Sequence, residues 1–193
     1  MPPSTRKSEI LTQAAHLFRR QGYQGTSLKN IANAVGMDAA PSLYNHISSK
    51  QAILEELILK VARSFHQGMS TIYGEDQTPS QQLKDIISLH VRLTIAEPNA
   101  IALVWQEWVH LDEDSKAEFL QLRARYEENF KSILVKGMQT GEFRKLDLEI
   151  TLFTLLSTLR SLYAWYSRNR DYTEKTLTQQ LSQALLHGLV KGD

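Results

Sequence analysis

A run of small and hydrogen-bonding residues at positions 39–46 is the part of this sequence best suited to contact another molecule directly. It reads Ala-Ala-Pro-Ser-Leu-Tyr-Asn-His and follows the short turn 35–38, Val-Gly-Met-Asp. Ser, Asn and Tyr can hydrogen-bond to phosphates or base edges, and Ala or Pro can pack against a thymine methyl. A helix bearing these residues could enter the DNA major groove, which is about 12 Å wide. The run therefore predicts a recognition helix.

Three short predicted helices within residues 5–46 would position this run. The first ends at Gly22, because glycine commonly follows a helix end. Thr26 is a suitable N-cap for the second helix, Gly36 closes it, and Asp38 can cap the third. Short helices joined by a glycine-containing turn have the proportions of a helix-turn-helix unit.

The remaining sequence is also expected to be helical, because its apolar residues recur at three- and four-residue spacing and no alternating run indicates a strand. Start signals for six further helices stand at Ser48, Thr78-Pro79, Pro98, Asp112, Asp147 and Thr173. We predict an all-α protein of nine helices, with a helix-turn-helix domain at 1–50 and a second helical domain at 51–193.

Composition argues against several classes of function. The chain has no cysteine, which removes disulfides, thiolate metal sites and a cysteine nucleophile. It also lacks the common metal, hydrolase and phosphate-binding motifs, so no cofactor, metal or enzymatic activity is expected. No apolar run approaches the roughly 18 residues of a membrane span, and the first residues lack the apolar core of a secretory signal, which favours a cytoplasmic location.

The charge is distributed unevenly along the chain. The net charge is +1, yet residues 1–66 hold eight Lys and Arg against four Asp and Glu. A basic amino-terminal third is expected to face a polyanion such as double-stranded DNA.

The sequence of residues 18–28, Phe-Arg-Arg-Gln-Gly-Tyr-Gln-Gly-Thr-Ser-Leu, resembles the joint between the first two helices of TetR-family repressors. Further matching segments are Ile31-Ala32, Val35-Gly36, residues 41–46 and Ser49-Lys50. The resemblance is clear over about residues 8–58. Beyond them, only the helix count, the chain length and the turn 141–144 correspond.

Two positions depart from the family pattern. The stretch from Gly36 to Leu43 is one residue longer than the common spacing, and Ile47 stands where phenylalanine is usual. The longer stretch leaves the assignment of individual bases open without threatening the fold.

Taken with this resemblance, the pattern assigns DNA contacts to the amino-terminal domain. The assigned residues are Arg6, Lys7, Thr26, Ser27, Lys29, Ala39, Ala40, Pro41, Ser42, Tyr44, Asn45, His46 and Lys50. Thr26 would cap a helix whose start meets a phosphate, Lys50 would contact the DNA backbone, and Arg6 and Lys7 would form a mobile arm. A core position for Tyr44, a packed or capping role for His46 and a merely solvated Lys50 are the alternatives.

The predicted helix that begins at Asp147 is apolar on two faces. Since a surface helix needs only one apolar stripe, one face is expected to meet a second subunit, and full enclosure in one bundle is the alternative. The resemblance implies a four-helix bundle between two copies. The predicted interface residues are Leu152, Leu155, Leu159, Leu162, Tyr166, Leu177, Leu181, Leu185 and Gly188.

A ligand pocket among the fifth to eighth predicted helices is also implied by the resemblance. Its expected lining is His90, Trp105, Trp108, Tyr126, Arg160 and Tyr163. A buried charge needs a partner, so Arg160 requires a ligand anion or, as we favour, an internal acid such as Glu107 or Glu128. For His90, a satisfied core histidine is the favoured alternative to a ligand contact.

The resemblance thus implies a homodimeric, ligand-responsive repressor that binds a palindromic operator and is released by a small effector. The aromatic residues of the expected pocket favour an apolar or acyl-type effector. The rival hypothesis keeps the DNA-binding unit but lets residues 67–193 serve dimerisation alone.

Overall fold

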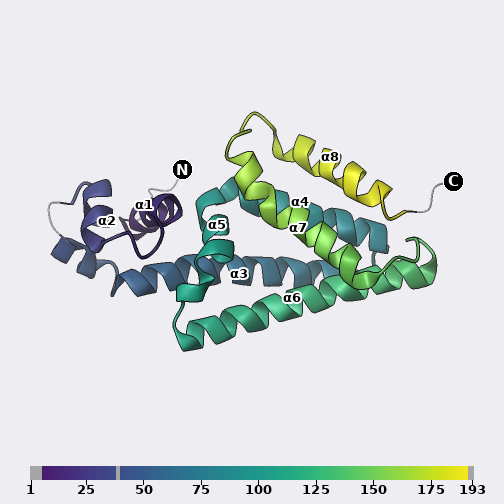
Figure 1. Cartoon of the computed structure of the whole chain (residues 1–193), viewed down its shortest axis with the longest axis horizontal. Helices are drawn as coiled ribbons and strands as arrows, with labels where there is room; N and C mark the ends of the chain where they lie inside the picture. Colours follow the sequence, from purple (N-terminus) through teal and green to yellow (C-terminus); the bar gives the residue numbers. More distant parts are fainter. Residues whose placement is uncertain (1–5, 38–39, 191–193) are drawn as a thin grey trace. The chain divides into compact units, whose positions relative to one another are not determined.

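The structure is a computed structural model and describes residues 6–37 and 40–190 (Figure 1). Within these ranges the chain forms eight α-helices and two 3₁₀ helices, and its one β-type pairing is an isolated bridge between Phe143 and Val190. The elements are α1 (Arg6–Gln21), α2 (Leu28–Ala34), η1 (Ala40–Asn45), α3 (Lys50–Gly74), α4 (Pro79–Ala96), α5 (Pro98–Gln106), η2 (Trp108–His110), α6 (Glu113–Thr140), α7 (Leu148–Tyr166) and α8 (Glu174–His187). The all-α prediction is confirmed: the nine predicted helices correspond to the eight α-helices and η1, and η2 is additional.

Most of the predicted helix starts are built by side-chain caps. Thr78, Asp112, Asp147 and Thr173 each accept a hydrogen bond from the backbone N–H three residues further on. Such caps satisfy amide groups that have no partner inside the helix. At α3 the prediction is one residue early, because Ser49 rather than Ser48 accepts from the Ala52 amide, at 2.9 Å.

The described chain divides into two compact units. The first contains the residues up to Ala62 together with Asn99–Leu120, and the second contains Arg63–Pro98 and the residues from Gln121 onward. Residues 99–120, which the sequence placed in the second predicted domain, thus pack within the first unit.

The core of the second unit is formed where α4 packs against α7 and α8. The turn after α6 closes this unit, with Gly141 at φ +79° as the predicted helix end. Gly137 makes room for the buried ring of Phe143, since a Cβ at position 137 would lie 2.2 Å from that ring.

Candidate nucleic-acid interface and effector region

The turn between α1 and α2 is held from inside by Thr26. This side chain is 1% exposed, and its hydroxyl donates to the Gly22 carbonyl at 2.9 Å. Gly22 has φ +78°, a left-handed conformation that glycine adopts without strain. The prediction that Thr26 caps α2 at a phosphate is therefore wrong: Thr26 is a buried residue of the turn.

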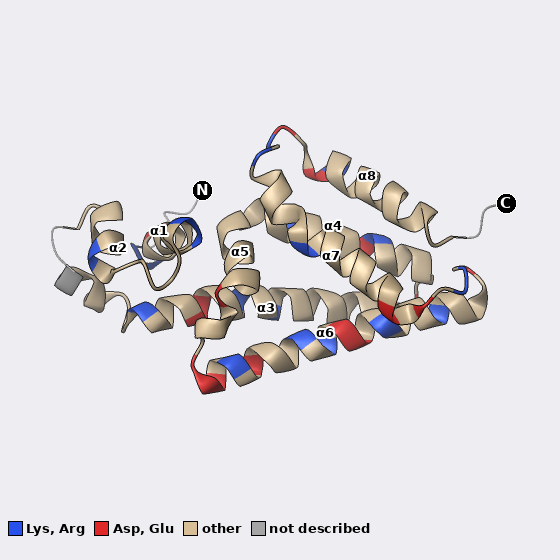
Figure 2. Ribbon diagram, in the orientation of Figure 1, with Lys and Arg blue, Asp and Glu red and all other residues tan. Residues whose placement is uncertain are grey.

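Ser27 caps α2 in its place. Its hydroxyl accepts from the Asn30 amide at 3.1 Å, and the Asn30 side chain accepts from the Ser27 amide at 2.8 Å. This reciprocal pair is a capping box, with Asn in the position usually held by Glu or Gln. Ser27 and Lys29 are exposed, and Lys29 is the only charged residue of α2 (Figure 2). The Lys29 ammonium is thus available to a phosphate, whereas the Ser27 hydroxyl donates to Asn30 Oδ1 at 2.6 Å and would have to exchange this bond for one to a phosphate.

The predicted recognition helix is the 3₁₀ helix η1, which is anchored by two apolar side chains. Leu43 is fully buried and Ile47 is 7% exposed. Between and beside these anchors, Ser42, Asn45 and His46 are exposed, and Tyr44 is 57% exposed. The core alternative for Tyr44 is therefore wrong.

The part of the predicted DNA-contacting run before Ser42 is only partly described by the structure. Asp38 and Ala39 lie outside the described residues, and so do the side chains of Ala40 and Pro41. The contact assignments for Ala39, Ala40 and Pro41 therefore remain predictions.

Lys50 binds the chain's own backbone. Its ammonium donates to the carbonyls of Tyr23, at 3.0 Å, and Thr26, at 2.8 Å. The same nitrogen lies 4.3 Å from the centroid of the Tyr23 ring, a cation–π distance. Neither the phosphate contact nor the solvated alternative anticipated this role: Lys50 fastens the α1–α2 turn to the start of α3.

Arg6 and Lys7 lie in the first turn of α1 rather than in a separate arm. Arg6 pairs with Glu9 at 2.8 Å and also donates to the Val35 carbonyl at 2.8 Å. Lys7 pairs with Glu56 at 2.8 Å. These side chains are all 40% exposed or more, and exposed ion pairs are weak, so both cations can exchange their partners for a phosphate.

In the second unit, His90 of α4 and Tyr126 of α6 form a buried polar pair. The His90 Nε2 and the Tyr126 hydroxyl are 2.8 Å apart, and the Phe65 ring packs against both side chains. Burial, reinforced by the charge of Arg160, lowers the pKa of His90 to about 3. Burial also raises the pKa of Tyr126. Both residues are therefore neutral at physiological pH, as the core-histidine alternative requires.

Arg160 of α7 pairs with an internal acid, as favoured, but the acid is Glu127 rather than Glu107 or Glu128. Glu127 also pairs with Arg123 at 3.0 Å. Burial alone would raise the pKa of Glu127, but the hydrogen bonds and charges of Arg123 and Arg160 outweigh burial and lower it. Two guanidinium groups thus share one carboxylate in this cluster.

The six predicted pocket residues fall into two groups. His90, Tyr126, Arg160 and Tyr163 belong to the second unit. Trp105 and Trp108 belong to the first unit, where Trp108 stacks on Phe119 with ring centroids 5.7 Å apart.

Both halves of the chain match models of one family. Residues 10–57 match the model described as bacterial regulatory proteins of the tetR family, and residues 76–189 match the tetracyclin repressor-like C-terminal domain. The second match alone spans more than half of the chain. The protein belongs to the TetR family.

The relatives of this TetR-family chain are transcriptional regulators. The HTH-type transcriptional repressor KstR2 of Rhodococcus jostii is 26% identical over 96% of this chain and 92% of its own length. The solved structure of the ketosteroid regulator KstR2 of Mycobacterium tuberculosis has a TM-score of 0.90 at 21% identity, covering 98% of this chain and 97% of that one. AibR, solved with isovaleryl coenzyme A and operator DNA, has a TM-score of 0.76 at 21% identity, covering 92% and 96%. These two structures show the shared fold.

This TetR-family protein is a DNA-binding transcriptional regulator and not an enzyme. None of its described helices combines the length and apolar character needed to cross a membrane. Among residues 6–37 and 40–190, no group of three or more His, Asp or Glu side chains is arranged to hold a metal ion.

The line of α7 residues predicted to meet a second subunit is buried within this chain. Leu152, Leu155, Leu159, Leu162 and Tyr166 are each at most 8% exposed and lie in the core of this chain. On α8, Leu177 is buried too, Leu181 and Leu185 are half-buried, and Gly188 is exposed. The face of α7 that remains open carries Ile150, Phe153 and Trp165, exposed by 66%, 71% and 40%. The α7 part of the predicted subunit interface is therefore wrong, because these side chains are buried within this chain.

Two residues of the DNA-binding half escaped the sequence analysis. Tyr23 and Gln51 are hydrogen-bonded to each other at 2.7 Å, although 28 positions separate them. The only sequence signal for either residue was that Tyr23 lies in the segment 18–28 that resembles the family.

Proposed function

We propose that this regulator is a repressor whose dimer binds a palindromic operator through η1 and is released by a small effector. The proposal rests on the different exposure of side chains in and just after η1. Leu43 and Ile47 are buried and anchor this segment, whereas its polar side chains are exposed. Such side chains can read base edges, while Ser27 and Lys29 contact phosphates.

The exposed face of α7 supports the dimer. Ile150, Phe153 and Trp165 form an apolar surface on a helix whose other face is already buried. Large exposed apolar side chains on one helix face mark an interaction surface. Paired about a two-fold axis, two copies would present their η1 helices about 34 Å apart, one turn of DNA, or at a small multiple of it.

A substitution on this face tests the dimer. Phe153→Lys should convert the dimer to a monomer in sedimentation velocity and weaken operator binding, while the helical circular dichroism is retained. Tyr73→Lys, which changes another exposed aromatic residue, is the control and should stay dimeric. A wild-type chain that sediments as a monomer at micromolar concentration would refute the proposed dimer.

An apolar or acyl-type effector is the best match to the second unit. His90 and Tyr126 are neutral, and Arg160 shares the Glu127 carboxylate with Arg123, so this cluster offers neutral hydrogen-bonding groups beside an excess of one positive charge. Two structural relatives, the ketosteroid regulator KstR2 and AibR solved with isovaleryl coenzyme A, are consistent with this class. Tyr163 remains a candidate lining residue of this unit, whereas Trp105 and Trp108 belong to the first unit.

The effector would act by preferring one arrangement of the dimer over another. Differential binding is required, because a ligand with equal affinity for both arrangements shifts nothing. Helix α3 is continuous from Lys50 to Gly74 and supplies residues to both units, so it can carry the change. In the cytoplasm, operator binding would repress transcription by blocking access of the polymerase.

Fluorescence anisotropy on DNA flanking the protein's own gene tests this function. Saturable binding to one palindromic segment that is much tighter than binding to random DNA, and that weakens steeply with salt, is the expected result. Straight-chain, branched and steroid acyl coenzyme A thioesters should then be titrated into the complex. Equal affinity for both DNAs would contradict operator recognition, and complete indifference to all three acyl classes would contradict the proposed effector.

A further inference from the structure

Residues 107–110 belong to one domain by sequence and to another by packing. They lie inside the match to the family's carboxy-terminal domain, residues 76–189. In the structure they pack within the first unit, as part of the segment Asn99–Leu120. The chain enters this segment from Pro98 and leaves it at Gln121, both residues of the second unit. Because Pro98 begins α5 and Gln121 lies within α6, a displacement of either residue would be transmitted along the chain to this segment.

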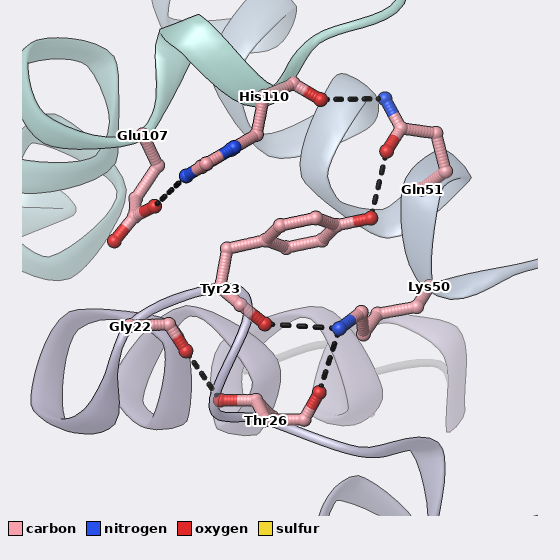
Figure 3. Close-up of polar contacts among 7 residues, drawn as sticks. All are labelled: Gly22, Tyr23, Thr26, Lys50, Gln51, Glu107 and His110. Carbon is pink, nitrogen blue, oxygen red and sulfur yellow. Dashed lines mark hydrogen bonds and ion pairs between the residues drawn. The ribbon is translucent and has the colours of Figure 1, made fainter.

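Gln51 connects this segment to the α1–α2 turn with both ends of its amide (Figure 3). The Tyr23 hydroxyl donates to Gln51 Oε1 at 2.7 Å, and Gln51 Nε2 donates to the His110 backbone carbonyl at 3.0 Å. Because a carbonyl can only accept, the His110 contact fixes which end of the amide is nitrogen. Only a residue with a donor and an acceptor on one short side chain can make both bonds.

The Tyr23 ring makes a second set of contacts, with His110 and Lys50. His110 stacks on this ring with centroids 5.6 Å apart and an interplanar angle of 28°. Figure 3 shows Lys50 on the other side of the ring from His110. His110 Nε2 lies 3.5 Å from a carboxylate oxygen of Glu107. Burial, together with the charge of Glu55, raises the pKa of Tyr23, so the hydroxyl keeps its proton and can donate to Gln51.

We propose that Gln51 is a positioning residue that couples the carboxy-terminal domain's segment 107–110 to the α1–α2 turn, and hence to the DNA-binding surface. This route is additional to α3, and it rests on the proposed function in that DNA is the second ligand. The turn that Gln51 reaches through Tyr23 is the one that Lys50 and Thr26 fasten, immediately before the cap of α2.

Coupling between two sites is reciprocal, which allows a test without the effector. If segment 107–110 influences DNA binding, then bound DNA must stabilise this segment in return. The measurement is amide hydrogen exchange by mass spectrometry on the dimer, with and without the operator duplex found by anisotropy. Backbone amides of residues 107–111 should exchange more slowly when DNA is bound.

Four variants separate the links of the connection. Gln51→Leu removes both hydrogen bonds. Gln51→Glu can still accept from Tyr23 but cannot donate to the His110 carbonyl, and Tyr23→Phe removes only the first bond while keeping the stacked ring. His110→Ala preserves the backbone carbonyl and removes only the stacking and the Glu107 contact. Gln81→Leu on α4, whose amide instead contacts Asp85 at 2.9 Å, is the control.

We expect Gln51→Leu and Gln51→Glu to abolish the DNA-induced protection of residues 107–111, while η1 stays protected by DNA. Operator affinity should fall about three- to tenfold in both variants, in keeping with the loss of one or two hydrogen bonds. Tyr23→Phe should lose part of the protection, and His110→Ala and Gln81→Leu should retain it.

Two results would overturn the coupling. One is wild-type protein whose residues 107–111 exchange at the same rate with and without DNA. The other is Gln51→Leu protein that keeps the DNA-induced protection, because shielding by DNA itself would then explain it. Failure of the proposed function is distinct, since wild-type protein would then bind no operator in the anisotropy assay.

Discussion

The α1–α2 turn of the first unit and the α4–α6–α7 cluster of the second unit use polar side chains differently. In the turn, Lys50 and Thr26 bond to backbone carbonyls. In the cluster, side chains pair with each other, His90 with Tyr126 and Arg160 with Glu127. A backbone carbonyl has no titratable proton, whereas the paired groups of the cluster do. Acid should therefore weaken the cluster before it weakens the turn.

The pH dependence of stability is the largest effect expected from this difference. The pKa of His90 is lowered to about 3 in the folded protein, from an ordinary value of 6.5. Both states are neutral at pH 7, but between pH 6.5 and 3 only the unfolded state binds the proton, so stability falls with decreasing pH. The limiting slope for one such group is about 1.4 kcal/mol per pH unit.

Urea unfolding at pH 7, 6 and 5, at one fixed dimer concentration, measures this slope. His90→Gln can retain a hydrogen bond to Tyr126 and should flatten the slope by nearly the full amount. His46→Gln replaces an exposed histidine of the first unit and should leave the slope as in wild type. Indistinguishable slopes for wild type and His90→Gln would show that the buried pair is not the acid-sensitive element.

The elements were easier to predict than the partners of individual side chains. Caps such as Asp147 are local, since donor and acceptor lie three residues apart, and a single sequence contains both. The acceptors of Lys50 are backbone carbonyls more than 20 positions away, which no side-chain pattern marks. Periodicity likewise found the buried line of α7, but which other positions stay exposed depends on where α4 packs.

In the DNA-binding site, too, local features could be predicted from the sequence, whereas features set by tertiary contacts could not. Exposure of Ser42 and Asn45 follows from the helical spacing around Leu43, whereas His46 would share the face of Leu43 in a continued helix and is exposed where η1 has ended at Asn45. Thr26 and Ser27 are both good capping residues by type, and only the tertiary turn decides between them. Of the two acids suggested for Arg160, Glu128 lies one position from the actual partner Glu127, because a side chain's direction on α6 depends on how that helix is rotated.

Leu43→Ala and Tyr44→Ala sharpen the contrast between anchor and reader within η1. Leu43 is fully buried, so its truncation should destabilise the protein by about 3 kcal/mol. Tyr44 is 57% exposed, and its truncation should change stability by less than about 0.5 kcal/mol while weakening operator binding. Urea unfolding and anisotropy on the same samples give both quantities. Equal destabilisation by the two variants would remove the distinction between them.

A smaller effect distinguishes the two lysines of the DNA-binding half. Lys50→Met keeps the apolar stem but loses the bonds to the Tyr23 and Thr26 carbonyls, so stability should fall by about 1 kcal/mol. DNA affinity should fall with it, whereas the salt dependence of binding should stay unchanged, since no phosphate contact is lost. Lys29→Met, on the exposed face of α2, should leave stability unaltered and reduce the slope of log affinity against log salt by about one. A reduced salt slope in Lys50→Met without loss of stability would contradict the bonds of Lys50 to the turn and assign it a phosphate contact instead.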